Sequence, residues 1–153
     1  MDPTKKELYT AKRSSGLDIT DEEIRINVSR LRSDSEPVNW ILLKVSGSAV
    51  LTTHAVGDVG YNLISALTED DVYYGAIKVL VAGQIKFYHI YFVGTDVGGM
   101  KKGKSSLYKS SVLGLIDAHG EISCASGLVE FTYDFLIDEI SKQSKIPKVD
   151  IRF

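Results

Sequence analysis

The stretch "GGMKKGKSS", residues 98–106, holds residue types that can bind phosphate. Gly98, Gly103, Lys104 and Ser105 satisfy the pattern G-x-x-x-x-G-K-[ST], and an apolar run, "IYFVG", lies just upstream. In a loop of this pattern the glycine-rich backbone surrounds the phosphates, the lysine pairs with them and the hydroxyl binds Mg²⁺. The stretch therefore predicts either a nucleotide site or a basic segment that serves another partner.

The surroundings of the motif disfavour the nucleotide interpretation. The upstream apolar run ends at Gly94, four residues before Gly98, and two variable positions are Lys101 and Lys102, where close backbone wrapping favours small residues. A nucleotide-binding sheet also needs further βα units after the loop, with a strand that ends in a Mg²⁺-binding carboxylate, and too few residues remain. A P-loop protein using Gly98 to Ser105 stays open as an alternative from another class.

Composition limits the classes of protein to which the chain can belong. A chain of 153 residues with 44% hydrophobic content can bury the core of one domain. Its 18 Lys and Arg against 20 Asp and Glu give a net charge of −2, which argues against a protein that coats nucleic acid. We expect no nucleic-acid partner, so local charge must carry any recognition of a polyanion.

The cysteine and histidine content excludes the common metal sites. Cys124 is the only cysteine, so neither an internal disulfide nor a multi-cysteine zinc site can form. His54, His89 and His119 fall on separate predicted elements. We expect no metal, no cofactor and no catalytic residues, and no G-x-S-x-G motif supports a hydrolase. No stretch is apolar enough to cross a bilayer, so we expect a cytoplasmic protein without membrane contact. We also expect a monomer.

Hydrophobic periodicity predicts an α/β chain of the α+β type. Residues 1–19 are polar and basic, which indicates a flexible extension; residues 20–142 form the domain and 143–153 a tail. Thr20 and Glu23 form a capping box for a helix over 21–33. Strands are predicted over 38–45 and 50–56, a short helical segment over 60–67, and a central hairpin over 72–81 and 85–94.

The last third of the chain alternates between helix and strand. A helix is predicted from Lys104 to Ile116, with Leu107 and Val112 in its apolar stripe, and Gly103 predicts a late start or a bend. A short strand over 119–126 and a helix over 128–143 follow. The aromatic residues of the central hairpin are expected to pack under the helices rather than to stack on RNA.

The order of these elements resembles the actin-depolymerising-factor homology (ADF/cofilin) family, and coactosin-like members in particular. The resemblance covers about Thr20 to Lys142 and depends on "NWILLKV", "TEDDVYYGAIKV", "KFYHIYFVG" and "VGGMKKGKSSLYKSSV". It implies a single ADF-homology domain with a mixed central sheet of five to six strands and helices on both faces. It also implies a non-enzymatic protein that binds the side of actin filaments within the actin cytoskeleton.

The same resemblance implies which residues contact actin. Family members use a lysine that opens the fourth strand and basic residues that lead into the long helix; the corresponding residues here are Lys86, Lys101, Lys102, Lys104 and Lys109. Lysines crowded at a helix N-terminus oppose the helix dipole, a cost that an acidic partner such as actin offsets. An ADF/cofilin-like protein that binds or releases actin monomers is the alternative within the family, and a solvated charge cluster is the alternative without a partner.

Overall fold

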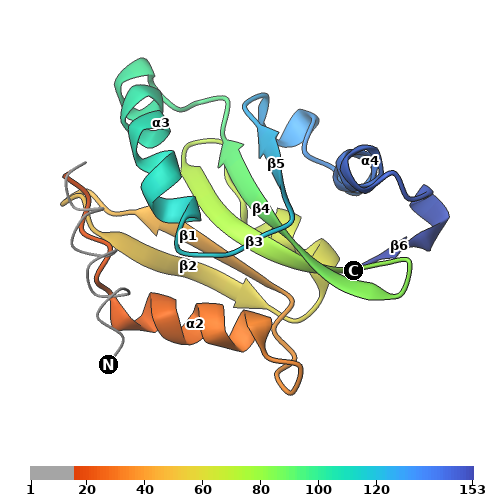
Figure 1. The fold of residues 1–153 in the computed structure, drawn as a ribbon. Coiled ribbons are helices and arrows are strands. Elements are labelled where there is room, and N and C mark those ends of the chain that lie inside the picture. The colour runs from red at the N-terminus through yellow and green to blue at the C-terminus, as the bar shows by residue number, and fades with distance from the viewer. Residues whose placement is uncertain (1–15) are drawn as a thin grey trace.

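A single mixed sheet organises the computed structural model, which describes residues 16–153 (Figure 1). The strands are β1 (Trp40–Val45), β2 (Leu51–Gly57), β3 (Val72–Val81), β4 (Gln84–Val93), β5 (Gly120–Cys124) and β6 (Ile151–Arg152). Their order is β2-β1-β3-β4-β5, and β6 pairs with β3 beyond the end of β1. All pairs are antiparallel except β4 with β5.

The β3–β4 hairpin at the centre confirms the sequence prediction. Its register runs without a bulge from Val81 opposite Gln84 to Val72 opposite Val93. Ala82 and Gly83 make the two-residue turn, with φ of 50° and 80°. Positive φ at both positions is the geometry that matches the right-handed twist of paired strands, and glycine adopts it at little cost.

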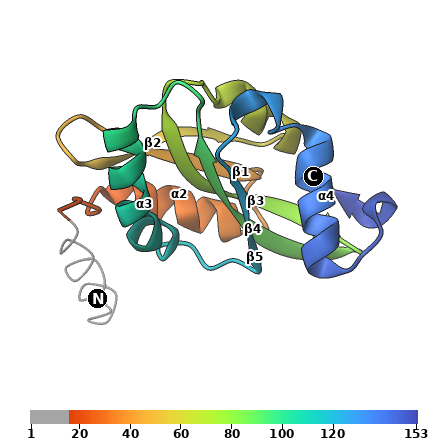
Figure 2. The same cartoon turned by 90° about the horizontal axis from the view of Figure 1, so that it is seen from above.

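Helices cover both faces of the sheet, as the sequence predicts (Figures 1 and 2). One face carries α2 (Glu22–Arg32) and α3 (Gly99–Leu113), which bury Ile24 and Val112 against Tyr74. The other face carries α4 (Tyr133–Ser144) and the 3₁₀ helix η2 (Gly60–Ala66), with Ile140 and Leu63 in the second core. Short 3₁₀ turns, η3 (Gly127–Val129) and η4 (Lys148–Asp150), flank α4.

The predicted cap of the first helix was wrong by one residue. Asp21 is the N-cap, and its carboxylate accepts from the Glu23 backbone N–H at 2.9 Å. Thr20 instead donates its hydroxyl proton to Asp18 Oδ1 at 2.6 Å. Both residue types cap well, so local preference alone did not decide between neighbouring candidates.

The predicted start of α3 was also wrong. The helix begins at Gly99 rather than Lys104, continues through Gly103 and ends at Leu113. Leu107, placed in the buried stripe by the sequence prediction, is 73% exposed.

The packed region extends on both sides of residues 20–142. Leu17 and Ile19 are fully buried, and Ile151 is buried where β6 joins β3. Most of the predicted N-terminal extension, residues 1–15, lies outside the described residues. No helix within residues 16–153 is long and apolar enough to cross a bilayer.

Candidate functional site

The N-terminal half of α3 concentrates positive charge where a helix least favours it. Gly98 is the N-cap and supplies no side-chain acceptor, and the first turn holds no acidic residue. Lys101, Lys102 and Lys104 follow within the next two turns. The positive end of the helix dipole raises the free energy of each lysine charge there by a few tenths of a kcal/mol. An acidic group outside the helix can offset this cost.

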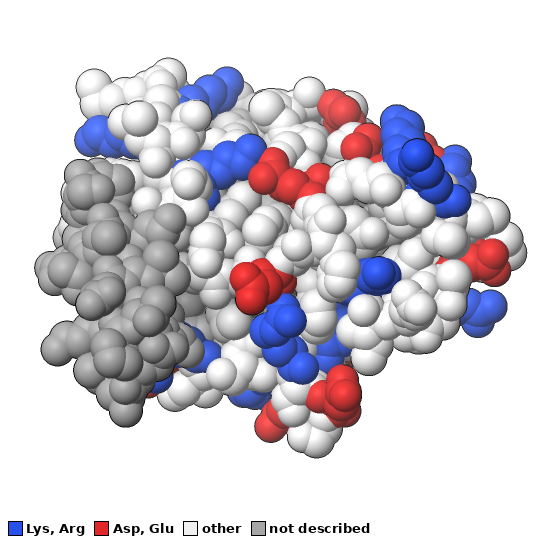
Figure 3. Space-filling model, in the orientation of Figure 1, with Lys and Arg blue, Asp and Glu red and all other residues white. Residues whose placement is uncertain are grey.

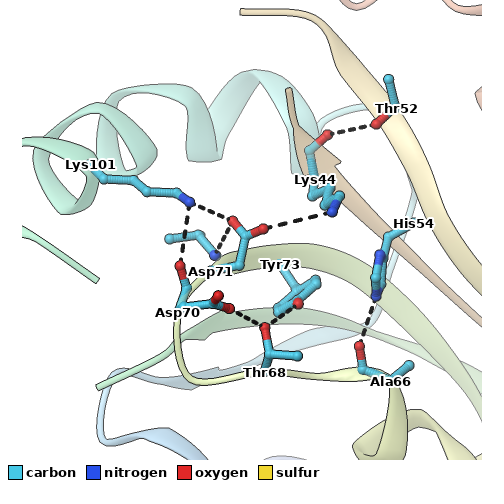
Figure 4. Close-up of polar contacts among 10 residues, drawn as sticks. Lys44, Thr52, His54, Ala66, Thr68, Asp70, Asp71, Tyr73 and Lys101 are labelled. Carbon is cyan, nitrogen blue, oxygen red and sulfur yellow. Dashed lines mark hydrogen bonds and ion pairs between the residues drawn. The ribbon is translucent and has the colours of Figure 1, made fainter. Parts of the chain in front are cut away.

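Asp71, which precedes β3, provides one such group (Figure 4). Its Oδ1 lies 2.8 Å from Lys101 Nζ, and its Oδ2 lies 3.8 Å from Lys44 Nζ. The Asp71 side chain is 19% exposed, so water screens this pair less than one at the open surface. Asp71 thus fixes the beginning of α3 to the beginning of β3 through Lys101.

The turn just before Asp71 is held by hydrogen bonds of the Thr68 hydroxyl. Thr68 donates its hydroxyl proton to Asp70 Oδ1 at 2.5 Å and lies 2.8 Å from the hydroxyl of Tyr73 (Figure 4). The Thr68 hydrogen bond lowers the pKa of the Asp70 carboxyl, which therefore stays ionised at neutral pH. Lys101 has a second acceptor in this turn, since its Nζ also lies 3.5 Å from the backbone carbonyl oxygen of Asp70.

Lys109, toward the other end of the helix, is half-buried and pairs with a residue of the sheet. Its Nζ lies 2.7 Å from Glu121 Oε2 on β5 and 4.8 Å from the centre of the Tyr91 ring. Burial acts to raise the pKa of Glu121, but hydrogen bonds from Lys109 and Ser123 outweigh it and the net shift is downward. Lys109 therefore fastens α3 to the edge of the sheet.

Lys102 and Lys104 are the two exposed lysines of α3 without an ion pair to any residue in the range 16–153. Residues two apart on a helix point to nearly opposite sides. Lys104 shares its side with Met100 and Leu107, at i−4 and i+3, and these apolar side chains are 79% and 73% exposed. Lys102 shares the other side with Lys109. Met100, Lys104 and Leu107 thus form one exposed side of α3, here called the outer ridge, which is apolar with a basic residue in the middle, and Lys102 lies on the opposite side of the helix.

Basic side chains form two groups on the face of the molecule that Figure 3 shows. In Figure 3, basic side chains gather over α3 and again over the α4 side of the molecule, and acidic side chains lie between the two regions. The basic surface on this face is therefore divided rather than continuous.

Lys86 lies apart from the α3 lysines. It pairs with Val79 across the β3–β4 ladder, and Val79 packs in the core beneath α4. The next residue, Phe87, packs on the opposite face against Leu31 and Ile116. Because side chains alternate along a strand, Lys86 projects on the α4 face. Along β3, Val79 is eight residues from Asp71, so roughly 26 Å separates Lys86 from the start of α3 along the strand.

The structure thus brings together four of the five predicted residues and separates the fifth. Lys101, Lys102, Lys104 and Lys109 share α3, with two of them engaged in internal ion pairs and two exposed.

Sequence reasoning missed the exposed apolar residues and both acidic partners. Met100 and Leu107, seven residues apart around Lys104, carried a readable signal, since this spacing places them on one face. Asp71 and Glu121 carried none, because their pairing depends on how distant elements pack.

The geometry of α3 excludes the P-loop alternative. Residues 99–113 are helical, and the Lys102 backbone N–H donates to the Gly98 carbonyl at 3.0 Å. The amides from Lys102 onward are therefore used within the helix and cannot surround a phosphate. Within the described part of the chain no three His, Cys, Asp or Glu side chains gather as a metal site.

Comparison with known proteins identifies the fold. Coactosin from Entamoeba histolytica superposes with a TM-score of 0.74 at 21% identity, over 86% of this chain and 99% of that one. Human coactosin-like protein gives 0.74 at 22% identity, over 82% and 98%. Mouse coactosin, described as an actin filament binding protein, gives 0.67 at 23% identity, over 82% and 91%. No curated protein sequence matched the chain.

The family described as cofilin/tropomyosin-type actin-binding proteins matches residues 16–141. The match includes β1 to β5, α2, α3 and all but the last turn of α4. Members of this family bind actin and are not enzymes, in agreement with the sequence prediction. The chain therefore belongs to the cofilin/tropomyosin-type actin-binding family, and its partner is actin.

Proposed function

We propose that this chain binds the side of actin filaments, and that α3 supplies the principal contact. The observation that carries the proposal is the exposed surface of α3, where Lys104 lies between Met100 and Leu107 on the outer ridge and Lys102 lies on the opposite side. Actin is acidic, so the two lysines gain partners on binding that they lack within the described chain. Burial of two exposed apolar side chains adds a driving force that salt does not screen.

Lys101 and Lys109 have a supporting role in this proposal. Lys101 pairs with Asp71 and Lys109 with Glu121, so both hold the helix in place against the sheet. A rigid helix presents its ridge without an ordering cost on binding. Their charges still contribute to the local field that attracts an acidic surface.

Lys86 favours a filament over a single actin molecule as the partner. Its position on the α4 face, far along β3 from the α3 ridge, supplies a second basic contact in a different direction. A filament presents neighbouring actin subunits, so one subunit can contact α3 while the next contacts Lys86. A monomer has only one such surface, which makes monomer binding through α3 alone the second candidate.

Co-sedimentation with filamentous actin tests the proposal. The native chain is expected to pellet with filaments, and a Lys102→Ala/Lys104→Ala double variant is expected to remain largely in solution. Arg25→Ala/Arg30→Ala on α2 removes the same charge from exposed positions elsewhere and serves as the matched control. Equal pelleting of the α3 double variant and the native chain contradicts the assigned surface.

The variant Lys86→Ala distinguishes filament side binding from monomer binding through α3 alone. Under the filament proposal it weakens filament binding but leaves binding to actin monomers unchanged, which fluorescence anisotropy of labelled monomeric actin measures. If Lys86→Ala changes neither, then α3 alone accounts for recognition, and the depolymerising-factor alternative gains support.

A further inference from the structure

A groove runs along the inner side of α3, between the helix and the β1–β2 turn. Its volume is about 620 Å³, within the range of pockets that bind small molecules. Its lining comes from three parts of the chain: Val45, Ser46, Gly47 and Ala49 at the β1–β2 turn, Asp71, Val72 and Tyr74 on or beside β3, and Gly98–Lys101, Lys104, Ser105 and Tyr108 on α3.

The floor of the groove is apolar. Val72 and Tyr74 are almost completely buried, and the half-buried Tyr108 forms part of the wall. The Tyr74 hydroxyl donates to the Ser105 carbonyl at 2.8 Å, so its polar end is already satisfied. Burial raises the pKa of Tyr74, which remains neutral. An apolar body can therefore occupy the floor without leaving a polar group unpaired.

The rim of the groove is cationic, but only weakly so. Lys101 and Lys104 contribute two positive charges, and Asp71 removes one of them by pairing with Lys101 at 2.8 Å. Lys104 has no ion pair to any described residue. One net positive charge matches a single anionic group, whereas a polyphosphate would meet the Asp71 carboxylate and lack cations for its remaining charges.

The mouth of the groove is open beside Gly98 and Gly99. A methyl group built onto Gly98 or Gly99 would meet no atom within 4 Å. Gly98 has a φ of −70°, which any residue adopts, so a larger side chain can be placed there without backbone strain.

We propose that this groove binds a small amphipathic monoanion, a carboxylate attached to an aliphatic or aromatic body. The body lies on Val72, Tyr74 and Tyr108, and the carboxylate pairs with Lys104 at the rim. Charge complementarity selects the anion, and removal of its apolar body from water supplies most of the free energy. Met100 and Lys104 of the outer ridge also line the groove, whereas Leu107 and Lys102 do not.

Binding of decanoate to the ¹⁵N-labelled full chain, followed by the movement of backbone amide signals in NMR spectra, tests the proposal without actin. Signals of residues 46–49 and 98–108 are expected to move in a saturable manner. Inorganic phosphate lacks the apolar body, and decyltrimethylammonium has the body with the opposite charge; neither is expected to move these signals at the same concentration. If decyltrimethylammonium moves them equally, or decanoate moves none of them, the proposal is wrong.

Two variants test the groove itself. Lys104→Glu is expected to weaken decanoate binding about fivefold or more, because it replaces an attraction with a repulsion. Gly98→Phe should abolish binding by filling the mouth from its open side. Lys102→Glu makes the same charge change on the same helix outside the groove, and it should leave the affinity unchanged. Equal losses in Lys104→Glu and Lys102→Glu would indicate unspecific attraction to α3 and overturn the site.

Since no step of this test contains actin, its outcome is independent of the proposed filament binding.

Discussion

Lys101 Nζ lies 2.8 Å from Asp71 Oδ1, and this pair joins the first turn of α3 to the beginning of β3. The contact offsets the unfavourable placement of a lysine near the positive end of a helix. It also divides the five predicted contact residues by role, since Lys101 is engaged internally while Lys102 and Lys104 face solvent.

Asp71→Asn should destabilise the fold slightly. The asparagine oxygen can still accept from the Val72 backbone N–H, so the change removes mainly the charge that holds Lys101 and Lys44. Because Lys101 is half-exposed, the expected loss in free energy of unfolding is about 0.5 kcal/mol in low salt, and it should shrink in high salt. Urea unfolding at two salt concentrations measures both. A loss that is the same at both concentrations contradicts an electrostatic role.

Glu121→Gln should show a pH-dependent loss of stability. The pKa of Glu121 is lowered in the folded state, so the Lys109 pair stabilises the fold above the ordinary carboxyl pKa and loses this effect as pH falls through the folded pKa. The variant should therefore be about 0.5 kcal/mol less stable at pH 7 and equal to the native chain near pH 2. Urea midpoints across this range check the sign; a difference that grows toward low pH contradicts it.

Leu107→Ala should leave stability unchanged, within about 0.5 kcal/mol, because the side chain is 73% exposed. Leu113→Ala, on the same helix but buried, should cost about 2 kcal/mol or more. Thermal or urea unfolding compares the two. In co-sedimentation with filaments, Leu107→Ala should weaken binding more than Leu113→Ala, since Leu107 belongs to the proposed contact. If Leu107→Ala unfolds as easily as Leu113→Ala, the exposed ridge does not exist.

Ile151→Ala should destabilise the domain by about 2 kcal/mol, near the low end for buried isoleucine because β6 is short. Val149→Ala, two residues earlier and 76% exposed, is the matched control and should be neutral. Equal midpoints for the two variants in urea would show that the C-terminal strand contributes nothing to the fold.

The sheet could be predicted from sequence because its central strands carry strong local signals. The hairpin of β3 and β4 has two long β-branched and aromatic runs separated by Ala82 and Gly83, and its register follows from that short turn. The start of α3 could not be predicted in the same way. Gly99 and Gly103 both disfavour helix locally, and the pair between Lys101 and Asp71 stabilises the early turns only after the chain has folded.

The candidate site was predictable in position along the chain but not in geometry. The family resemblance pointed to lysines that the structure places on one helix, yet it could not say that Lys101 and Lys109 have internal partners. The face on which Lys86 projects depends on strand register, since a shift of one residue would turn it to the other side.

Salt dependence of co-sedimentation tests the central claim most directly, that α3 binds actin filaments through Lys102 and Lys104. Exposed charges are screened over about 10 Å at 0.1 M salt, so the pelleted fraction of the native chain should fall steeply as salt rises. The Lys102→Ala/Lys104→Ala variant should bind more weakly at low salt and respond less to added salt. Binding that stays constant across the salt range, or a variant with the same salt response as the native chain, would contradict the account.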